Sequence, residues 1–138
     1  MNTIVVDSSV IVKWLNQTNE VNIAKADEIL QSAFEGSVEL VAPELARYEI
    51  GNVLMKKRLT IPEAVISLST VYSLPISFIP ESEELANETY NIAFNSGITY
   101  YDASFMSLAK LYDATLVTEN LKHQGKSKDI KVKHLKDY

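Results

Sequence analysis

The sequence contains no cysteine, so disulfides, zinc–thiolate sites and thiol nucleophiles are all excluded. Glycine and proline are scarce, with four of each, and neither a phosphate-binding P-loop nor a dinucleotide-binding fingerprint occurs. No run approaches the roughly 18 apolar residues that a membrane-spanning helix needs. The first six residues lack the positive segment of a signal peptide and predict a strand. We therefore expect an intracellular, cytoplasmic protein with no membrane partner.

The remaining composition is that of one ordinary globular domain, which we expect to span residues 1–138. Its net charge of −5 argues by itself against a nucleic-acid partner. The charge is uneven, however, because residues 121–138 carry six lysines against two aspartates. This basic segment could contact phosphates or could be a solvated end of the chain. His123 and His134 lie in it without metal-ligand spacing, and we expect both on the surface.

Apolar strand patterns alternate with helical patterns along the chain. Strands are expected at residues 4–6, 40–42, 76–79, 114–117 and 130–135, the last at an edge. Helices are expected at residues 10–15, 23–34, 43–58, 61–72, 82–97 and 102–112. This alternation predicts an α/β fold with a central, mostly parallel sheet of about five strands, flanked by helices on both faces.

Several details of these helices are specific enough to test. Pro43 suits the first turn of the helix that follows it. Thr60 and Glu63 match a capping box. Tyr112 is expected to face the core, and so is one stripe of the helix after Thr60, made of Ala64, Val65, Leu68, Val71 and Tyr72.

Polar residues stand where the apolar strands stop or where helices present a polar side: Asp7, Glu49, Asp102 and the pair Glu119–Asn120. Because parallel strands end at the same edge of a sheet, such residues converge in one crevice. Gathered carboxylates repel one another unless a cation lies between them. Oxygen-only ligand sets favour hard cations such as magnesium or manganese. The pattern therefore predicts a divalent-metal phosphodiesterase site.

Each of these residues also has a plain structural interpretation. Asp7 and Asp102 could be helix caps, Glu49 a surface residue and Asn120 a turn residue. Helix caps have no reason to fall on converging elements every time, so the joint placement favours a site.

Neighbouring residues could assist the acids. Ser9 could hydrogen-bond a phosphate or a water bound to Asp7, or it could cap the helix. Asn52 follows Glu49 by three positions and shares its helix face. Thr118 directly follows the strand expected at residues 114–117 and precedes Glu119.

Four motifs, taken in order and spacing, resemble the PIN-domain family, and most closely its VapC-type toxins. They are residues 5–10 (VVDSSV), 42–52 (APELARYEIGN), 101–103 (YDA) and 116–120 (LVTEN), and the resemblance covers essentially the whole chain. It implies a parallel sheet with flanking helices and a magnesium- or manganese-dependent endoribonuclease. It also implies an RNA substrate, a small antitoxin partner and a homodimer.

The resemblance also assigns roles to residues. Asp7, Glu49 and Asp102 match the three acids that hold metal, Ser9 matches a hydroxyl that supports the first acid, and Asn52 matches a polar position beside the second.

One position departs from the family pattern. Asn120 stands where the family often has aspartate, and the adjacent Glu119 should point to the opposite side of an extended chain. A second metal site is then weak, filled only with substrate, or absent. The departure also supports an alternative, a catalytically silent PIN-like module that binds RNA or a protein partner.

The contacts to RNA and to a second subunit follow from other residues. Arg47, Lys13 and the lysines of residues 121–138 are the cations expected to be available to RNA phosphates. Apolar residues beyond the main helix stripes are expected to form the homodimer surface: Ile50, Leu54, Met55 and Ile66.

Overall fold

Five parallel strands form one sheet in the order β3-β2-β1-β4-β5. The computed structural model describes residues 2–121 and 129–138. The strands are β1 (Asn2–Val6), β2 (Val38–Pro43), β3 (Ile76–Ile79), β4 (Thr115–Thr118) and β5 (Val132–His134). The prediction of an α/β fold with about five parallel strands is confirmed, and β5 is the predicted edge strand. His123 and the lysines at 122, 126 and 128 lie outside the described residues.

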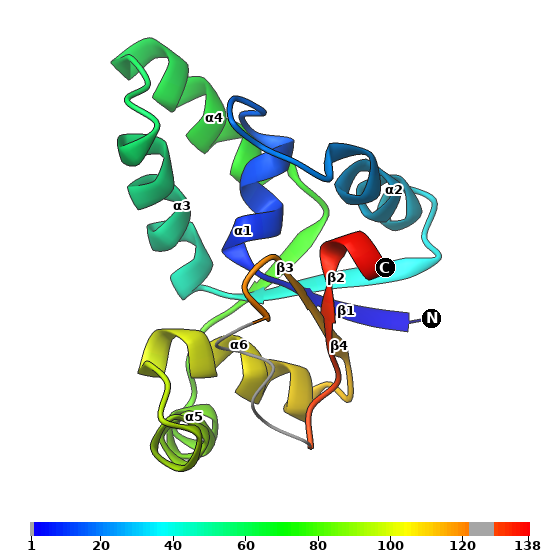
Figure 1. Cartoon of the computed structure of the whole chain (residues 1–138), viewed down its shortest axis with the longest axis vertical. Coiled ribbons are helices and arrows are strands. Elements are labelled where there is room, and N and C mark those ends of the chain that lie inside the picture. The colour runs from blue at the N-terminus through cyan, green and yellow to red at the C-terminus, as the bar shows by residue number, and fades with distance from the viewer. Residues whose placement is uncertain (1, 122–128) are drawn as a thin grey trace.

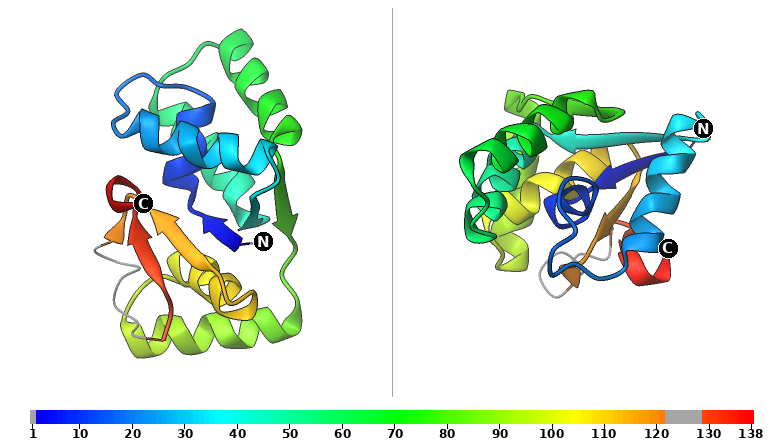
Figure 2. Two further views of the ribbon diagram at one scale, coloured as in Figure 1. Left: turned by 90° about the vertical axis from the view of Figure 1, so that its right-hand side faces the viewer. Right: turned by 90° about the horizontal axis from the view of Figure 1, so that it is seen from above.

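In the described part of the chain, six α-helices flank this sheet. They are α1 (Ser8–Ile11), α2 (Ile23–Phe34), α3 (Leu45–Lys56), α4 (Ile61–Ser73), α5 (Glu83–Ser96) and α6 (Tyr100–Leu111), with short 3-10 turns η1 (Val12–Trp14) and η2 (Leu135–Asp137). Figure 1 and Figure 2 show α1 and α2 on one side of the sheet and α6 on the other, with α5 packed against α6. None of the described helices is long and apolar enough to cross a membrane.

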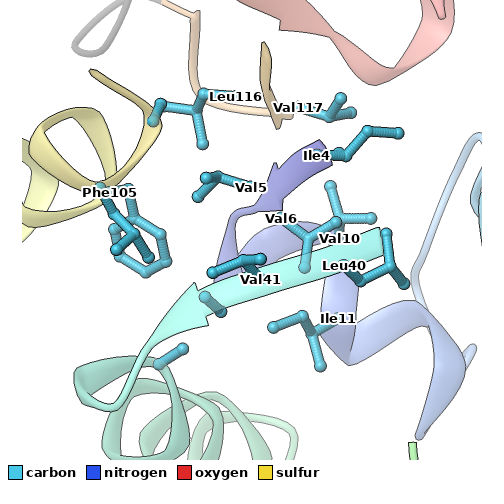
Figure 3. Close-up of a cluster of buried hydrophobic side chains, with 14 of the residues drawn as sticks. Ile4, Val5, Val6, Val10, Ile11, Leu40, Val41, Phe105, Leu116 and Val117 are labelled. Carbon is cyan, nitrogen blue, oxygen red and sulfur yellow. The ribbon is translucent and has the colours of Figure 1, made fainter. Parts of the chain in front are cut away.

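The core lies where the central strands meet helices from both sides (Figure 3). Val5, Val41 and Leu116 are fully buried in three adjacent strands. Phe105 of α6 and Ile11 of α1 are buried with them in the same cluster. A parallel sheet covered on both faces needs apolar residues at successive positions, which explains the apolar runs at residues 4–6 of β1 and 40–43 of β2. Each fully buried side chain of this size contributes about 1.5–3 kcal/mol.

The sheet order places a topological switch point between β1 and β4. The chain leaves β1 for β2 on one side, whereas β4 pairs with the other side of β1. In such sheets, ligands bind in the crevice at the carboxyl ends of the two strands. Asp7 directly follows β1, its backbone N–H donates to the carbonyl of Val117 in β4 at 3.0 Å, and Glu119 directly follows β4. The topology therefore brings two of the predicted site segments together.

The predicted boundaries of the third helix are wrong at both ends. Pro43 is the last residue of β2, where it pairs with Ile79 of β3, and the helix begins only at Leu45. At the other end, Arg58 has a φ of +57°. This left-handed conformation cannot continue a helix, so α3 ends at Lys56.

The capping box at the start of α4 is confirmed, because Thr60 and Glu63 hydrogen-bond reciprocally. The predicted inward stripe is wrong for most of α4. Val71 is buried, but Val65 is 56% and Tyr72 70% exposed, since α4 lies at the periphery, where it covers little of the core (Figure 1). Tyr112 is exposed as well, because it caps the end of α6.

The predicted homodimer surface is also partly wrong. Ile50 and Leu54 of α3 are buried in the core, whereas Met55 and Ile66 are exposed.

Candidate functional site

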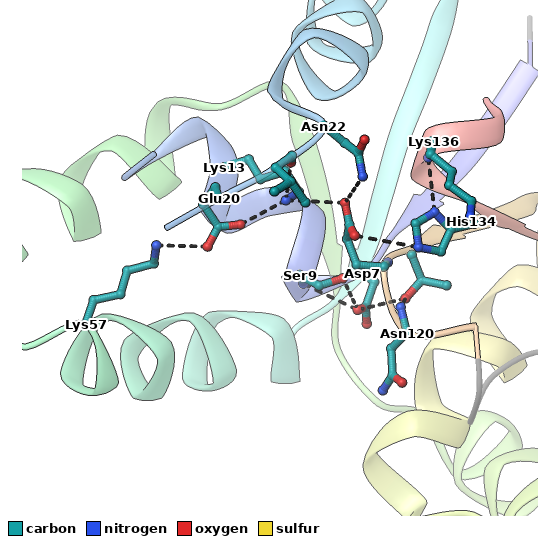
Figure 4. A network of polar contacts seen from close by, with 12 residues as sticks. Asp7, Ser9, Lys13, Glu20, Asn22, Lys57, Asn120, His134 and Lys136 are labelled. Carbon is teal, nitrogen blue, oxygen red and sulfur yellow. Dashed lines mark hydrogen bonds and ion pairs between the residues drawn. The ribbon is translucent and has the colours of Figure 1, made fainter. Parts of the chain in front are cut away.

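Asp7 is held at the end of β1 by three hydrogen bonds to one carboxylate oxygen. Its Oδ2 atom accepts from the Ser9 hydroxyl at 2.6 Å, the Ser9 backbone N–H at 3.3 Å and the Thr118 hydroxyl at 3.1 Å. The contact with the Ser9 N–H also makes Asp7 the N-cap of α1. Hydroxyls that donate to an ionised carboxylate stabilise its charge. Ser9 and Thr118 thus fix an 8%-exposed aspartate in one orientation, and Figure 4 shows Ser9 beside Asp7.

Glu49 reaches the same region from the middle of α3. Its Oε1 atom accepts a hydrogen bond from the hydroxyl of Ser8 at 2.8 Å. Burial raises the pKa of Glu49, the Ser8 hydrogen bond lowers it, and the negative charges of Asp7 and Asp102 raise it, so the pKa lies above its ordinary value. The charges of these two aspartates act on Glu49, which places the three acids in one electrostatic environment.

Asp102 lies in the first turn of α6 and is not its cap. The cap is Thr99, whose Oγ1 atom accepts a hydrogen bond from the Asp102 backbone N–H at 3.1 Å. An acid in this turn is stabilised by the partial positive charge at a helix N-terminus. Asp102 is therefore not the helix cap that the sequence allowed, although the charge of the helix terminus favours an acid at this position.

The three acids supply oxygen ligands of the kind that magnesium and manganese prefer. Across residues 2–121 and 129–138, however, no three His, Cys, Asp or Glu side chains stand close enough together to hold a metal ion as they are arranged. Like charges keep such carboxylates apart. The chemistry of the donor set fits a divalent cation, and binding one would require the side chains of Asp7, Glu49 and Asp102 to close around it.

Glu119 and Asn120 both follow β4 but take part in different contacts. The Asn120 backbone N–H donates to Thr118 Oγ1 at 2.8 Å, and the Thr118 hydroxyl in turn donates to Asp7. The Glu119 backbone N–H donates to Ser9 Oγ at 3.1 Å. Both backbone groups are thus linked through a hydroxyl to Asp7.

The carboxylate of Glu119 contacts a separate network of polar side chains, of which Figure 4 labels Lys13, Asn22 and His134. It lies 3.3 Å from Lys13 Nζ, 3.1 Å from Asn22 Nδ2 and 3.6 Å from Nε2 of His134. His134 is half-buried in this contact, so its predicted position as a surface residue is wrong.

Lys13 is not the exposed cation that the sequence suggested. Its side chain is 2% exposed, and its ammonium contacts Glu20 at 2.9 Å, Glu119 at 3.3 Å and the carbonyl of Val21 at 2.7 Å. Burial tends to raise the pKa of Glu20, but hydrogen bonds from Lys57 and Lys13 and their charges outweigh it, so this pKa is lowered. Lys13 is a structural cation, and a phosphate could reach it only by displacing these partners.

Arg47 packs between two aromatic rings. Its guanidinium carbon lies 4.7 Å from the centre of the Tyr72 ring and 4.3 Å from that of Phe78. Its Nε atom is buried and has no hydrogen-bond partner among the described residues. These contacts attach α3 to α4 and β3. Asn52, by contrast, is exposed one turn after Glu49.

Ser8 is the residue at the site whose role the sequence did not reveal. It lies between Asp7 and Ser9, the two residues that the motif emphasised. Its role depends on contact with Glu49, 41 positions away. The only local signal was a second hydroxyl directly after the strand-end aspartate.

The fold is that of an α/β protein with a parallel sheet, and the candidate acids come from the end of β1, from α3 and from α6. The family model described as PIN domain matches residues 4–127, and the chain therefore belongs to the PIN-domain family. No curated protein matches it.

Three solved structures share this fold along nearly the whole chain. The structure of VapBC2 from Rickettsia felis, bound to a DNA fragment from their promoter, is similar with a TM-score of 0.73 at 14% identity, covering 96% of this chain and 98% of that one. The structure of PAE2754 from Pyrobaculum aerophilum has a TM-score of 0.65 at 25% identity, covering 95% of this chain and 89% of that one. A toxin–antitoxin complex from Klebsiella pneumoniae gives 0.64 at 16% identity and coverages of 95% and 96%.

Proposed function

We propose that this protein is an intracellular endoribonuclease that hydrolyses RNA phosphodiester bonds with magnesium or manganese. One observation carries the proposal. Ser8, the residue directly after Asp7, donates a hydrogen bond to Glu49 of α3 at 2.8 Å, so acids from separate elements lie near one another, and the charges of Asp7 and Asp102 both act on Glu49. Membership of the PIN-domain family supports the same reaction. Acids without a cation would gain nothing from this proximity.

In this proposal Asp7, Glu49 and Asp102 hold the metal. Ser9 and Thr118 orient Asp7 through their hydrogen bonds to Oδ2. When bound, a divalent cation lowers the pKa of a coordinated water and neutralises charge that develops on the phosphate. The products would be a 5′-phosphate and a 3′-hydroxyl.

Asn120 would provide a neutral oxygen beside these acids, because its backbone is linked to Asp7 through Thr118. Glu119 would not provide a ligand, since its carboxylate already contacts Lys13, Asn22 and His134. With three acids and one neutral amide, the site would bind a first metal ion well and a second metal ion only weakly.

We also propose that the protein is the toxin of a toxin–antitoxin pair. The similar structures include a toxin–antitoxin complex, and they support a small antitoxin partner. A partner's arginine or lysine that reached the acids would supply the opposite charge in place of the metal and would inhibit the enzyme.

Asn120 favours a second candidate function, a silent module that binds RNA or a partner without cleaving. Fold alone does not establish activity. Incubation of a mixed RNA pool with manganese separates the two functions. We expect cleavage by the wild type, none in EDTA, and at least about a 100-fold loss in Asp7→Asn, which removes a charge that fixes the metal. Asp27→Asn, an exposed acid of α2, is the matched control and should cleave normally. Binding without manganese-dependent cleavage would establish the silent module.

A further inference from the structure

A cavity of about 370 Å³ opens next to the acid site but does not contain the three acids. It lies between the junction of β2 and α3, the end of β3, and helices α5 and α6. Tyr48 and Tyr101 are among its lining residues, and they directly precede Glu49 and Asp102. One residue along a helix turns the side chain by about 100° and rises 1.5 Å. The residues that line the cavity and two of the acids, Glu49 and Asp102, therefore lie on adjacent faces of α3 and α6.

The lining combines aromatic rings, an apolar wall and carboxylates. Tyr48 is 76% and Tyr101 60% exposed, so both rings are open to a ligand. Leucines at 45, 85 and 108 supply apolar contact. Among the described residues, no lysine or arginine lines the cavity. A phosphate would therefore find no positive charge in the cavity. A flat ring with N–H donors on its edge would find aromatic side chains to stack on and carboxylates to accept its hydrogen bonds.

The two carboxylates of the lining are not equivalent. Glu81 accepts a hydrogen bond from the hydroxyl of Tyr100, which raises the pKa of Tyr100 to about 12. Glu44 precedes α3 as its N-cap residue, yet its side chain makes no capping hydrogen bond. Glu44 is exposed and also lines the cavity. It is therefore the better placed acceptor for a ligand.

We propose that this cavity binds one base of the RNA substrate, and that it selects guanine. Guanine presents two adjacent N–H donors on its Watson–Crick edge, and these match the two oxygens of the Glu44 carboxylate. Tyr48 and Tyr101 would contact the face of the ring, as aromatic residues do when they bind splayed bases of single strands. The assignment of the cavity to the RNA substrate rests on the proposed function, because the bound base would belong to a nucleotide next to the phosphodiester bond that is hydrolysed at the acids.

An arginine side chain of a protein partner is the other ligand that could fit the cavity, because its guanidinium group is planar and carries N–H donors. The position of the cavity beside the acids, together with a volume that accommodates a whole base, favours the nucleotide.

Binding of mononucleotides tests the pocket without requiring cleavage. GMP, AMP, CMP and UMP are titrated by calorimetry into metal-free protein. We expect GMP to bind with the highest affinity. Glu44→Gln should lower the affinity for GMP at least about tenfold, and Tyr48→Leu should lower the affinity for all four nucleotides by a similar factor. Tyr90→Leu, an exposed tyrosine of α5 that is absent from the lining, should leave binding unchanged. Equal affinity for the four nucleotides, or Glu44-dependent binding of N-acetylarginine amide in place of GMP, would overturn the proposal.

Cleavage mapping separates this inference from the proposed function. If RNA is cut, Glu44→Gln should remove a preference for guanine next to the cut and raise KM more than it lowers kcat. Cleavage with an unchanged pattern in Glu44→Gln and Tyr48→Leu would refute the pocket and leave the nuclease standing. Glu44-dependent GMP binding without any RNA cleavage would support the pocket as a base-binding site and refute the nuclease.

Discussion

The Ser8 hydroxyl donates to Glu49 Oε1 at 2.8 Å and thereby joins the first residue of α1 to the middle of α3. Ser8 directly follows Asp7, so the same short segment orients two of the three candidate metal ligands. Asp7 is fixed by Ser9, and Glu49 by Ser8. This hydrogen bond also lowers the pKa of Glu49, against burial and the two aspartates.

Ser8→Ala should impair the site without removing an acid. Without the donor, the pKa of Glu49 rises further, because only burial and negative charges then act on it. We expect the acid limb of the pH–rate profile for RNA cleavage to move to higher pH, with a several-fold lower rate at neutral pH. The profile is measured in manganese beside Ser69→Ala, an exposed serine of α4. An unmoved acid limb would show that Ser8 has no influence on catalysis.

Glu49→Gln should change how metal-free stability depends on pH. The folded-state pKa of Glu49 lies above its ordinary value of 4.5, so the folded protein binds more protons than the unfolded chain. Stability therefore falls as pH rises from about the ordinary value through the raised one. At neutral pH in EDTA, Glu49→Gln should melt higher than the wild type, and this advantage should disappear on acidification.

Thermal melts between about pH 4 and pH 7.5 provide the measurement, with Glu39→Gln, an exposed glutamate of β2, as control. At one manganese concentration, a hundredfold above the dissociation constant of the wild type, binding stabilises the folded wild type by about 2.7 kcal/mol. The wild type should show this gain, and Glu49→Gln should show less of it. Equal gains would mean that Glu49 is not a metal ligand.

Asn120→Asp should tighten manganese binding. Asn120 is linked through Thr118 to Asp7, and aspartate would replace a neutral oxygen with an anionic one. Calorimetric titration with manganese should give a lower dissociation constant or a second binding event. Asn91→Asp, an exposed residue of α5, controls for the added charge. Unchanged affinity and stoichiometry would identify Asn120 as a turn residue only.

Local signals in the sequence predicted the parts of the fold and site that depend on neighbouring residues. Asp7 follows an apolar run and therefore marks the end of β1. The capping box of Thr60 and Glu63 requires only residues three positions apart, and it forms as expected. The convergence of segments on one edge of the sheet followed from the strand–helix alternation, which fixes a parallel sheet.

Features that depend on distant partners could not be predicted in the same way. Lys13 is buried because Glu20 and Glu119 lie beside it, and Glu119 belongs to a segment more than a hundred positions later. The stripe of α4 shares one helix face, but periodicity does not reveal whether another element covers that face. Tyr72 is consequently exposed at the periphery of the fold, whereas Val71 is buried. Both residues fit the helical spacing of the stripe, because they follow Leu68 by four and three positions.

Arg47→Lys should lower stability and leave RNA binding unchanged. The guanidinium lies between Tyr72 and Phe78, and a lysine ammonium cannot stack on both rings in this way. We expect a loss of about 1 kcal/mol in the free energy of unfolding. Arg58→Lys, at an exposed residue after α3, is the control. RNA affinity measured against salt in Arg47→Gln distinguishes the roles, because removal of a charge that contacts a phosphate would reduce the slope of log K against log salt by about one.

Self-association should depend on α3 and α4. These helices pack on each other and expose Met55 (77%), Ile61 (81%) and Ile66 (68%). We expect these exposed apolar residues to form an interface together. Sedimentation velocity at micromolar concentration should show a homodimer. Met55→Lys and Ile66→Lys, made separately, should each raise its dissociation constant at least about tenfold, because each would place a charge in an apolar contact. Phe94→Lys, on α5 and 76% exposed, should leave the dimer intact. A wild type that sediments only as a monomer, or a dimer lost in Phe94→Lys alone, would contradict an interface on α3 and α4.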